Sequence, residues 1–191
     1  EIKPHAIVAY KKNFHNEEIF GDITKIPAKK IPDFHILLAG FPCQPFSSAG
    51  SRKGFLDTRG TLFFYIVRIL KEKKPAAFLV ENVEGLTTHD RIDPKKPIGR
   101  TLETILSRLE KLEYHVTLKV FDASLYGVPQ KRMRIYIVGS KKNKIDLENL
   151  PKKPSRLADV LLEQVDSTKY LNTEFTKKLF SHYKLSDLPG K

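Results

Sequence analysis

The sequence predicts an α/β fold with a mostly parallel sheet flanked by helices. Short apolar runs alternate along the chain with amphipathic helical patterns, and this alternation is typical of strands joined by crossover helices. The chain has 191 residues, 40% of them hydrophobic, which suffices for one folded domain with its own core. Folds of this class bind ligands beyond the carboxyl ends of their strands, so candidate site residues are expected directly after the strands.

The apolar runs predict four buried strands, and a shorter fifth run is a further candidate. All five are bounded by turn residues, and they span 35–41, 76–83, 115–123 and 134–139, with the shorter run at 18–23. The strand predictions leave room between them for helical connections.

Two segments between these strands have the spacing of amphipathic helices. In 61–74, apolar residues recur on one face, with Asp57 or Thr58 available as an N-cap and Pro75 as the stop. In 101–112, one isoleucine and several leucines recur at the same spacing. These segments are the predicted helices of the α/β layer.

The composition changes after residue 140. Residues 141–156 have the composition of a linker, and 157–183 have the pattern of one or two short amphipathic helices. The domain is therefore expected to span 1–140, with 141–191 as a linker and a further region.

Charge and composition limit the possible partners and compartments. With 34 basic and 22 acidic residues the net charge is +12, which attracts polyanions, although lysine-rich surfaces also serve solubility alone. No apolar run is long enough for a membrane helix, and the first residues lack a signal-peptide pattern. A single cysteine excludes an internal disulfide framework and any all-cysteine zinc cluster, so no metal site is expected and the cytoplasm is favoured.

That cysteine, Cys43, lies between Pro42 and Pro45 directly after the 35–41 strand. A cysteine at a strand end is more often packing than a nucleophile. The two prolines stiffen the turn, however, which suits an exposed sulfur, and 47–60 has the composition of a mobile loop that could close over a site. A thiol with a pKa of about 8.5 needs nearby positive charge to react near neutral pH, so both interpretations stay open.

Charged residues at two other strands are candidates for the same edge. Glu81 follows an apolar run and is either a turn cap or a proton donor. Arg132 and Arg134 are two residues apart, hence on one face if the strand has begun there, and they could supply the positive charge. The alternative is that they only protect a strand edge against aggregation.

Three blocks occur in order with helical spacers between them: GFPCQPFS, ENVEGL and GVPQKRMRIYIVG. Together they closely resemble the DNA cytosine-5 methyltransferases, in particular the bacterial enzymes of restriction-modification systems, and GDI and GFLDTRGTLFF fit the same family. The resemblance covers residues 1 to about 140 strongly. It implies a Rossmann-like methyltransferase fold that uses S-adenosylmethionine and methylates C5 of cytosine in a specific double-stranded DNA sequence, in the cytoplasm of a bacterium.

The resemblance also implies a covalent mechanism on a base flipped out of the duplex. Cys43 matches the thiolate that adds to cytosine C6, and Glu81 matches the acid that meets the charge developing at N3 and the exocyclic amine. Arg134 matches the residue that hydrogen-bonds cytosine O2, and Arg132 matches its companion.

Further matches concern the cofactor, the DNA and support of the loop. Glu1 matches the acid that binds the ribose hydroxyls, and the other matches at the cofactor are Ile2, Asp22, Ile23, Pro42 and Leu62. The matches at the DNA are Gln44, Ser47 and Arg59, and the supporting positions are Asn82 and Gln130.

Two family features are missing from this sequence. The glycine-rich loop that holds the methionine part of the cofactor is absent, and nothing after residue 140 matches the last blocks or the target-recognition region, to which 141–191 is expected to lead. We therefore expect an incomplete sheet, as in a fragment or a piece of a split enzyme. The alternatives are a DNA-binding or partner subunit, inactive until a second polypeptide completes the domain, and an RNA cytosine-5 methyltransferase.

Overall fold

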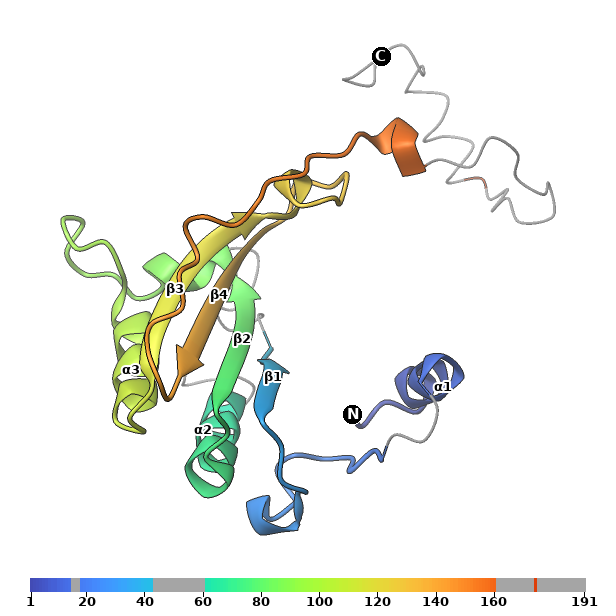
Figure 1. Ribbon diagram of the computed structural model, residues 1–191, viewed down its shortest axis with the longest axis vertical. Helices are drawn as coiled ribbons and strands as arrows, with labels where there is room; N and C mark the ends of the chain where they lie inside the picture. Colours follow the sequence, from blue (N-terminus) through green and yellow to red (C-terminus); the bar gives the residue numbers. More distant parts are fainter. Residues whose placement is uncertain (15–17, 43–60, 161–173, 175–191) are drawn as a thin grey trace. The chain divides into compact units, whose positions relative to one another are not determined.

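The computed structural model describes residues 1–14, 18–42, 61–160 and 174. The chain divides into two compact units, one made of 1–121 with 133–150 and the other of 122–132 with 151–191. The elements in chain order are α1 (Pro4–Asn13), β1 (Ile36–Gly40), α2 (Leu62–Lys73), β2 (Ala77–Val83), α3 (Arg100–Glu110), β3 (His115–Asp122) and β4 (Met133–Ser140) (Figure 1). Short 3-10 helices lie at Ala28–Lys30, Glu84–Thr88, Ala123–Leu125 and Leu157–Val160.

The four described strands form one sheet in the order β1-β2-β4-β3. β1 and β2 are parallel, whereas β2 and β4 are antiparallel, and β3 and β4 run in opposite directions (Figure 1). The α/β class is thus confirmed, but the described sheet is mixed rather than mostly parallel. The physical reason is the connection 123–132, which is too short for the crossover that a parallel neighbour requires.

The prediction of a strand at 18–23 is wrong, because the structure has no strand in this segment. Gly21 has a φ of +83°, in the left-handed region, and the Asp22 carboxylate accepts hydrogen bonds from both the main-chain N–H and the hydroxyl of Thr24. These local bonds make a turn in place of a strand ladder. The other four strands and both helices lie within two residues of their predicted bounds.

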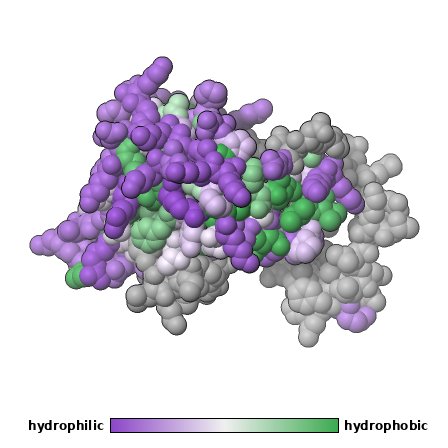
Figure 2. All heavy atoms as spheres, turned by 90° about the horizontal axis from the view of Figure 1, so that it is seen from below, coloured by the Kyte–Doolittle hydropathy of each residue, from purple (hydrophilic) through white to green (hydrophobic). Residues whose placement is uncertain are grey.

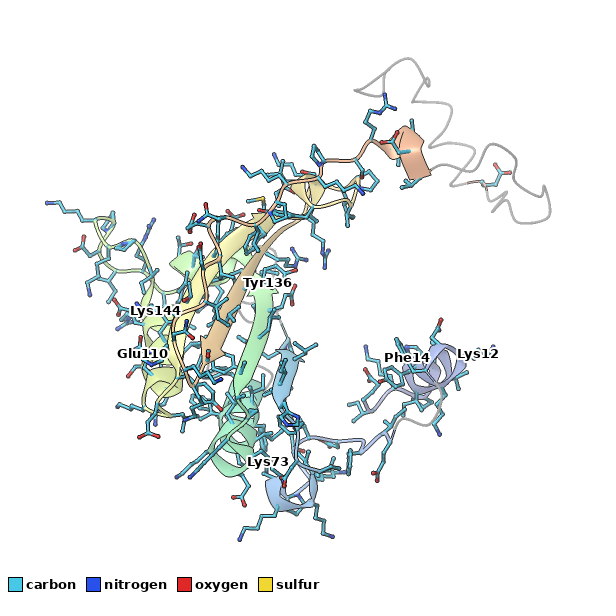
Figure 3. The ribbon with its side chains drawn as sticks, viewed as in Figure 1. Lys12, Phe14, Lys73, Glu110, Tyr136 and Lys144 are labelled. Carbon is cyan, nitrogen blue, oxygen red and sulfur yellow. The ribbon has the colours of Figure 1, made fainter. Side chains whose placement is uncertain are left out.

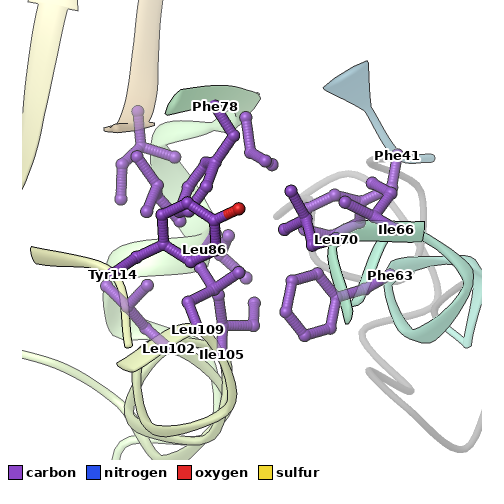
Figure 4. Close-up of a cluster of buried hydrophobic side chains, with 13 residues drawn as sticks. Phe41, Phe63, Ile66, Leu70, Phe78, Leu86, Leu102, Ile105, Leu109 and Tyr114 are labelled. Atoms are coloured by element: carbon purple, nitrogen blue, oxygen red, sulfur yellow. The ribbon is translucent and has the colours of Figure 1, made fainter. Parts of the chain in front are cut away.

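One face of the sheet packs against α2 and α3. On β2 the side chains of Phe78, Val80 and Asn82 are buried, while those between them are only half-buried. The two helices and β4 contribute fully or almost fully buried side chains to the same core, among them Phe63, Ile66 and Leu70 of α2, Leu102, Ile105 and Leu109 of α3, and Ile135 and Ile137 of β4 (Figure 4). Because side chains alternate along a strand, Glu81 projects from the opposite face.

Tyr114 belongs to the core near the start of β2. Its buried hydroxyl donates to the carbonyl oxygen of Pro75 at 2.7 Å, and its ring meets Phe78 edge-on at 5.0 Å. Burial raises the pKa of Tyr114 to about 12, so the phenol stays neutral. Gly139 is required nearby, since a Cβ there would lie 2.2 Å from the Phe78 ring.

The surface is strongly polar. Hydrophilic side chains cover much of the described part of the face seen in Figure 2, in keeping with the net charge of +12. Within the described ranges, the longest apolar helix falls short of what a bilayer crossing needs.

Candidate active site and cofactor pocket

Glu81 and Arg134 meet on the face of the sheet that the helices do not cover. The antiparallel register pairs Glu81 with Tyr136 and Val83 with Arg134, so Glu81 and Arg134 are diagonal neighbours. The Arg134 Nε lies 3.1 Å from the Glu81 Oε1, and the two side chains are 20% and 35% exposed, respectively. A second nitrogen, Nη1 of Arg134, donates to the Met133 carbonyl oxygen at 2.7 Å, which restrains the guanidinium. The pair is thus a preformed, solvent-accessible arrangement of cation and carboxylate.

Gly40 brings the end of β1 beside this pair. The parallel register aligns Gly40 with Glu81, and a Cβ built at Gly40 would lie 3.6 Å from the Glu81 Oε2. The absence of a side chain at Gly40 therefore leaves open space next to the carboxylate. Arg134 Nε contacts Oε1 of Glu81, and Oε2 is the carboxylate oxygen nearest to Gly40.

Asn82 fixes the chain where it leaves β1. Its side chain is 1% exposed, and its Nδ2 donates to the Phe41 carbonyl oxygen at 3.1 Å. Its Oδ1 accepts the Val83 N–H at 2.8 Å, so both ends of the buried amide are bonded. The Phe41 ring lies in the core, 5.6 Å from the Phe63 ring. Phe41 is thus held by its ring and by its carbonyl, directly ahead of Pro42.

Four predicted site residues lie outside the described residues: Cys43, Gln44, Ser47 and Arg59. The mobile loop predicted at 47–60 lies outside them as well. The described part of the site therefore ends at Pro42, one residue before the candidate nucleophile.

Arg132 and Gln130 belong to the second unit. Since β4 begins at Met133, Arg132 precedes the strand, and the shared face expected for Arg132 and Arg134 does not form. The main-chain N–H of Arg132 instead donates to the Asp122 carboxylate at 3.1 Å, while its carbonyl oxygen accepts the Ala123 N–H. Together with the N–H of Ser124, which makes the larger contribution, this bond lowers the pKa of Asp122.

A pocket of about 320 Å³ lies in the first unit, a volume suited to a small-molecule ligand. Its walls are mostly apolar, and two carboxylates reach it; the lining residues are Glu1, Tyr10, Glu18, Ile19, Phe20, Gly21, Ile23, Ile26, Ile31 and Ile69. Glu1 and Ile23 are thus brought together, as expected for a cofactor site, and Asp22 lies between two lining residues. Ile2, Pro42 and Leu62 do not line this pocket.

Nearby hydrogen-bond donors lower the pKa of Glu1, which lines this pocket, and of Asp22, which lies beside it. Glu1 Oε1 accepts the N–H groups of Lys3 and Ile2 at 2.9 and 2.8 Å, which lower the pKa of Glu1. The hydroxyl of Thr24, followed by its N–H, lowers the pKa of Asp22. The main-chain nitrogen of Glu1 also donates to the Gly21 carbonyl oxygen at 3.2 Å, which joins the two acidic segments.

The pocket fits the adenosine part of S-adenosylmethionine. An apolar slot suits a purine ring, and an ionised carboxylate suits the ribose hydroxyls, which donate hydrogen bonds. In this arrangement Glu1 would hold the ribose, while the isoleucines would enclose the base. The donor set is therefore consistent with the chemistry expected of the cofactor.

Sequence patterns missed several residues of this pocket, among them Tyr10, Glu18 and Ile69. Arg68 was missed as well, although it donates to the carbonyl oxygens of Ile23 and Ile26, two residues of the pocket wall. A signal existed for Arg68 alone: it is a charged residue placed between apolar positions of an amphipathic helix.

Comparison with known proteins identifies the family. The C-5 cytosine-specific DNA methylase family matches residues 1–188. The chain is 54% identical over 191 residues to the type II methyltransferase M.NlaIV of Neisseria lactamica, covering all of this chain and 44% of that protein. It is 50% identical over 175 residues to the type II methyltransferase M1.ScrFI of Lactococcus lactis subsp. cremoris, covering 89% and 43% of the two chains.

A solved structure shares the fold. The S. pombe Dnmt2 methyltransferase superposes with a TM-score of 0.68 at 23% identity, over 95% of this chain and 57% of that one. The present chain spans less than half the length of the two type II methyltransferases named above. The family match and the level of identity agree with the architecture, and the chain belongs to the C-5 cytosine-specific DNA methylase family.

Proposed function

We propose that the protein containing this chain transfers a methyl group from S-adenosylmethionine to C5 of cytosine in a specific duplex DNA sequence, as the methyltransferase of a bacterial restriction-modification system. The family match and the relatives named as type II methyltransferases support the reaction and the substrate class. The observation that carries the proposal is the Glu81–Arg134 pair beside the end of β1, where the chain continues to Cys43.

The pair matches the polar edge of cytosine. Along that edge the base presents the acceptor O2, then N3, then the exocyclic amine. Arg134 supplies the donor for O2, and Glu81 lies directly beside it for N3 and the amine. Negative charge moves toward N3 and O2 when a nucleophile adds to C6. A proton delivered from Glu81 to N3 and a hydrogen bond from Arg134 to O2 therefore stabilise the addition more than the ground state.

The chemical step begins at Cys43. Its thiolate adds to C6, forming the carbon–sulfur bond, and the electrons of the C5–C6 double bond become available at C5. When bound, S-adenosylmethionine supplies the electrophilic methyl group. A base then removes the C5 proton, and the electrons of the C5–H bond restore the double bond as the thiolate leaves. Flipping the base out of the stack is required because C6 is inaccessible within the duplex.

The remaining predicted residues act around this centre. Arg132 would approach the phosphate side, with Gln44, Ser47 and Arg59 on the DNA. Glu1 and Ile23 would hold the adenosine, with Ile2, Asp22, Pro42 and Leu62 near it. The basic net charge favours binding to the DNA backbone. The bacterial type II methyltransferases among the relatives support a place in the bacterial cytoplasm.

The test is methyl transfer from labelled donor to duplex DNA and to structured RNA, with the modified base identified by sequencing after bisulfite treatment. The proposal expects C5-methylcytosine at one short sequence in duplex DNA and little transfer to RNA. Methylation of RNA alone would support the alternative substrate. Activity of the chain only after addition of a second polypeptide would support the split-enzyme alternative.

A further inference from the structure

Arg68 connects α2 to a turn that is distant in the sequence. Its Nη2 donates to the carbonyl oxygens of Ile23 and Ile26, each at 2.8 Å and more than 40 residues earlier in the chain. The guanidinium carbon lies 4.9 Å from the centre of the Tyr65 ring. Among the described residues no carboxylate pairs with Arg68, so its positive charge is directed at main-chain carbonyls.

These carbonyls belong to the wall of the cofactor pocket. Ile23 and Ile26 line it, and so does Ile69, the neighbour of Arg68 on α2. Local bonds close the turn itself, through the Asp22 carboxylate to Thr24 and through the Lys25 N–H to the Asp22 carbonyl oxygen. No strand ladder anchors this turn to the described sheet, because residues 18–26 pair with no strand. The hydrogen bonds of Arg68 thus connect the turn directly to α2, which packs against the sheet.

Lys73 offers a comparison on the same helix. It also reaches back in the sequence, donating to the Lys29 carbonyl oxygen at 3.3 Å and to Asp33 Oδ1 at 3.0 Å. Neither Lys29 nor Asp33 lines the pocket. Figure 3 places Lys73 on α2. Arg68 and Lys73 thus make similar long-range hydrogen bonds from the same helix. Only the partners of Arg68 line the pocket.

We propose that Arg68 is a positioning residue for the methyl donor, acting by holding the carbonyls of Ile23 and Ile26 so that this turn keeps the shape of the adenosine-binding wall. The inference rests on the proposed function, since it takes the pocket to be the S-adenosylmethionine site. A planar guanidinium can bond two carbonyls in a fixed geometry, which an ammonium group does less well.

The test compares variants of the full-length protein. Arg68→Met is expected to raise the Kd of S-adenosylmethionine, measured by titration calorimetry, about tenfold or more, because two hydrogen bonds from a charged donor are lost. The KM for the donor should rise in parallel, while the Kd for duplex DNA changes by less than about twofold. Arg68→Lys should lie between the wild type and Arg68→Met, and it remains informative if Arg68→Met does not fold.

Lys73→Met is the matched control. It is expected to leave the donor Kd within about twofold of the wild type, even where it lowers the melting temperature, since its partners lie outside the pocket. If Arg68→Lys and Lys73→Met lower the melting temperature alike and leave the donor Kd equally unchanged, Arg68 is only structural and the inference is overturned.

Two pocket variants separate this failure from failure of the proposed site. Glu1→Gln and Ile23→Asp should each weaken binding of the donor. If they do so and Arg68→Met and Arg68→Lys do not, the site stands and the role of Arg68 is wrong. If neither pocket variant changes the donor Kd, the pocket is not the donor site, and the inference falls with it.

Discussion

The face of the sheet covered by α2 and α3 and the opposite face share the same strands but differ in what their side chains do. On β2, Phe78 and Val80 are fully buried on the covered face, whereas Leu79 and Glu81 are half-buried on the other. A single alternating strand thus places packing residues on one face and a candidate catalytic carboxylate on the other. The charged pair of Glu81 and Arg134 therefore needs few supports of its own, because the core fixes the backbone beneath it.

Asn82 is the exception on the covered face. It is polar, fully bonded and buried, and it contacts the segment that leads to Cys43 instead of adding to the apolar core. Its presence indicates that the covered face also positions the edge of the site.

The largest expected difference between the faces concerns stability. Phe78→Ala should lower the free energy of unfolding by about 3–5 kcal/mol, because it removes a buried ring and leaves a cavity. Leu79→Ala, the neighbouring residue on the other face, should cost clearly less. Denaturant unfolding of both variants makes the comparison, and equal losses would mean that both faces are packed alike in the full protein.

The second prediction concerns catalysis on the open face. Glu81→Gln keeps the shape of the side chain but cannot donate a proton in the same way, so the rate of methyl transfer should fall by a factor of about 10² to 10⁴. Stability should change by less than about 1 kcal/mol, since the ion pair with Arg134 is partly exposed. Single-turnover kinetics and denaturant unfolding check the two parts. A loss of folding without a separate loss of rate would favour a structural role.

The smallest expected effect on rate is at Asn82. Asn82→Ala removes the hydrogen bonds that the buried Asn82 side chain makes with the Phe41 carbonyl oxygen and the Val83 N–H, which should cost about 1–3 kcal/mol in stability. The rate of the covalent step should also fall, by about tenfold, because the chain ahead of Cys43 loses its restraint. Rapid-quench kinetics on folded protein measures this rate, and an unchanged rate would limit Asn82 to packing.

Much of the fold could be predicted from local patterns. The four strands and two helices of the sheet layer are strongly apolar and bounded by turn residues, so their periodicity is clear. α1 was missed because its apolar residues do not gather on one face; none of its residues is buried. Strand direction was missed in part, since apolar patterning does not encode whether a neighbour is parallel.

The candidate site could be predicted as residues but not as contacts. Glu81 and Arg134 are visible in the sequence, but their meeting depends on the antiparallel register of β2 and β4. Arg68 could not be assigned a role, because its partners are main-chain carbonyls that only the tertiary fold brings near. The roles of Cys43 and of the DNA-contacting residues stay predictions from the family resemblance.

The most direct test of the covalent mechanism uses a target cytosine with fluorine at C5. Once Cys43 has added to C6 and the methyl group has been transferred, no proton remains at C5, so the thiolate cannot leave. We expect a protein–DNA adduct that survives denaturing electrophoresis, forms only with S-adenosylmethionine present, and is absent in Cys43→Ser. If fluorinated duplex and methyl donor give no adduct while ordinary duplex is still methylated, the addition of Cys43 to the base is contradicted.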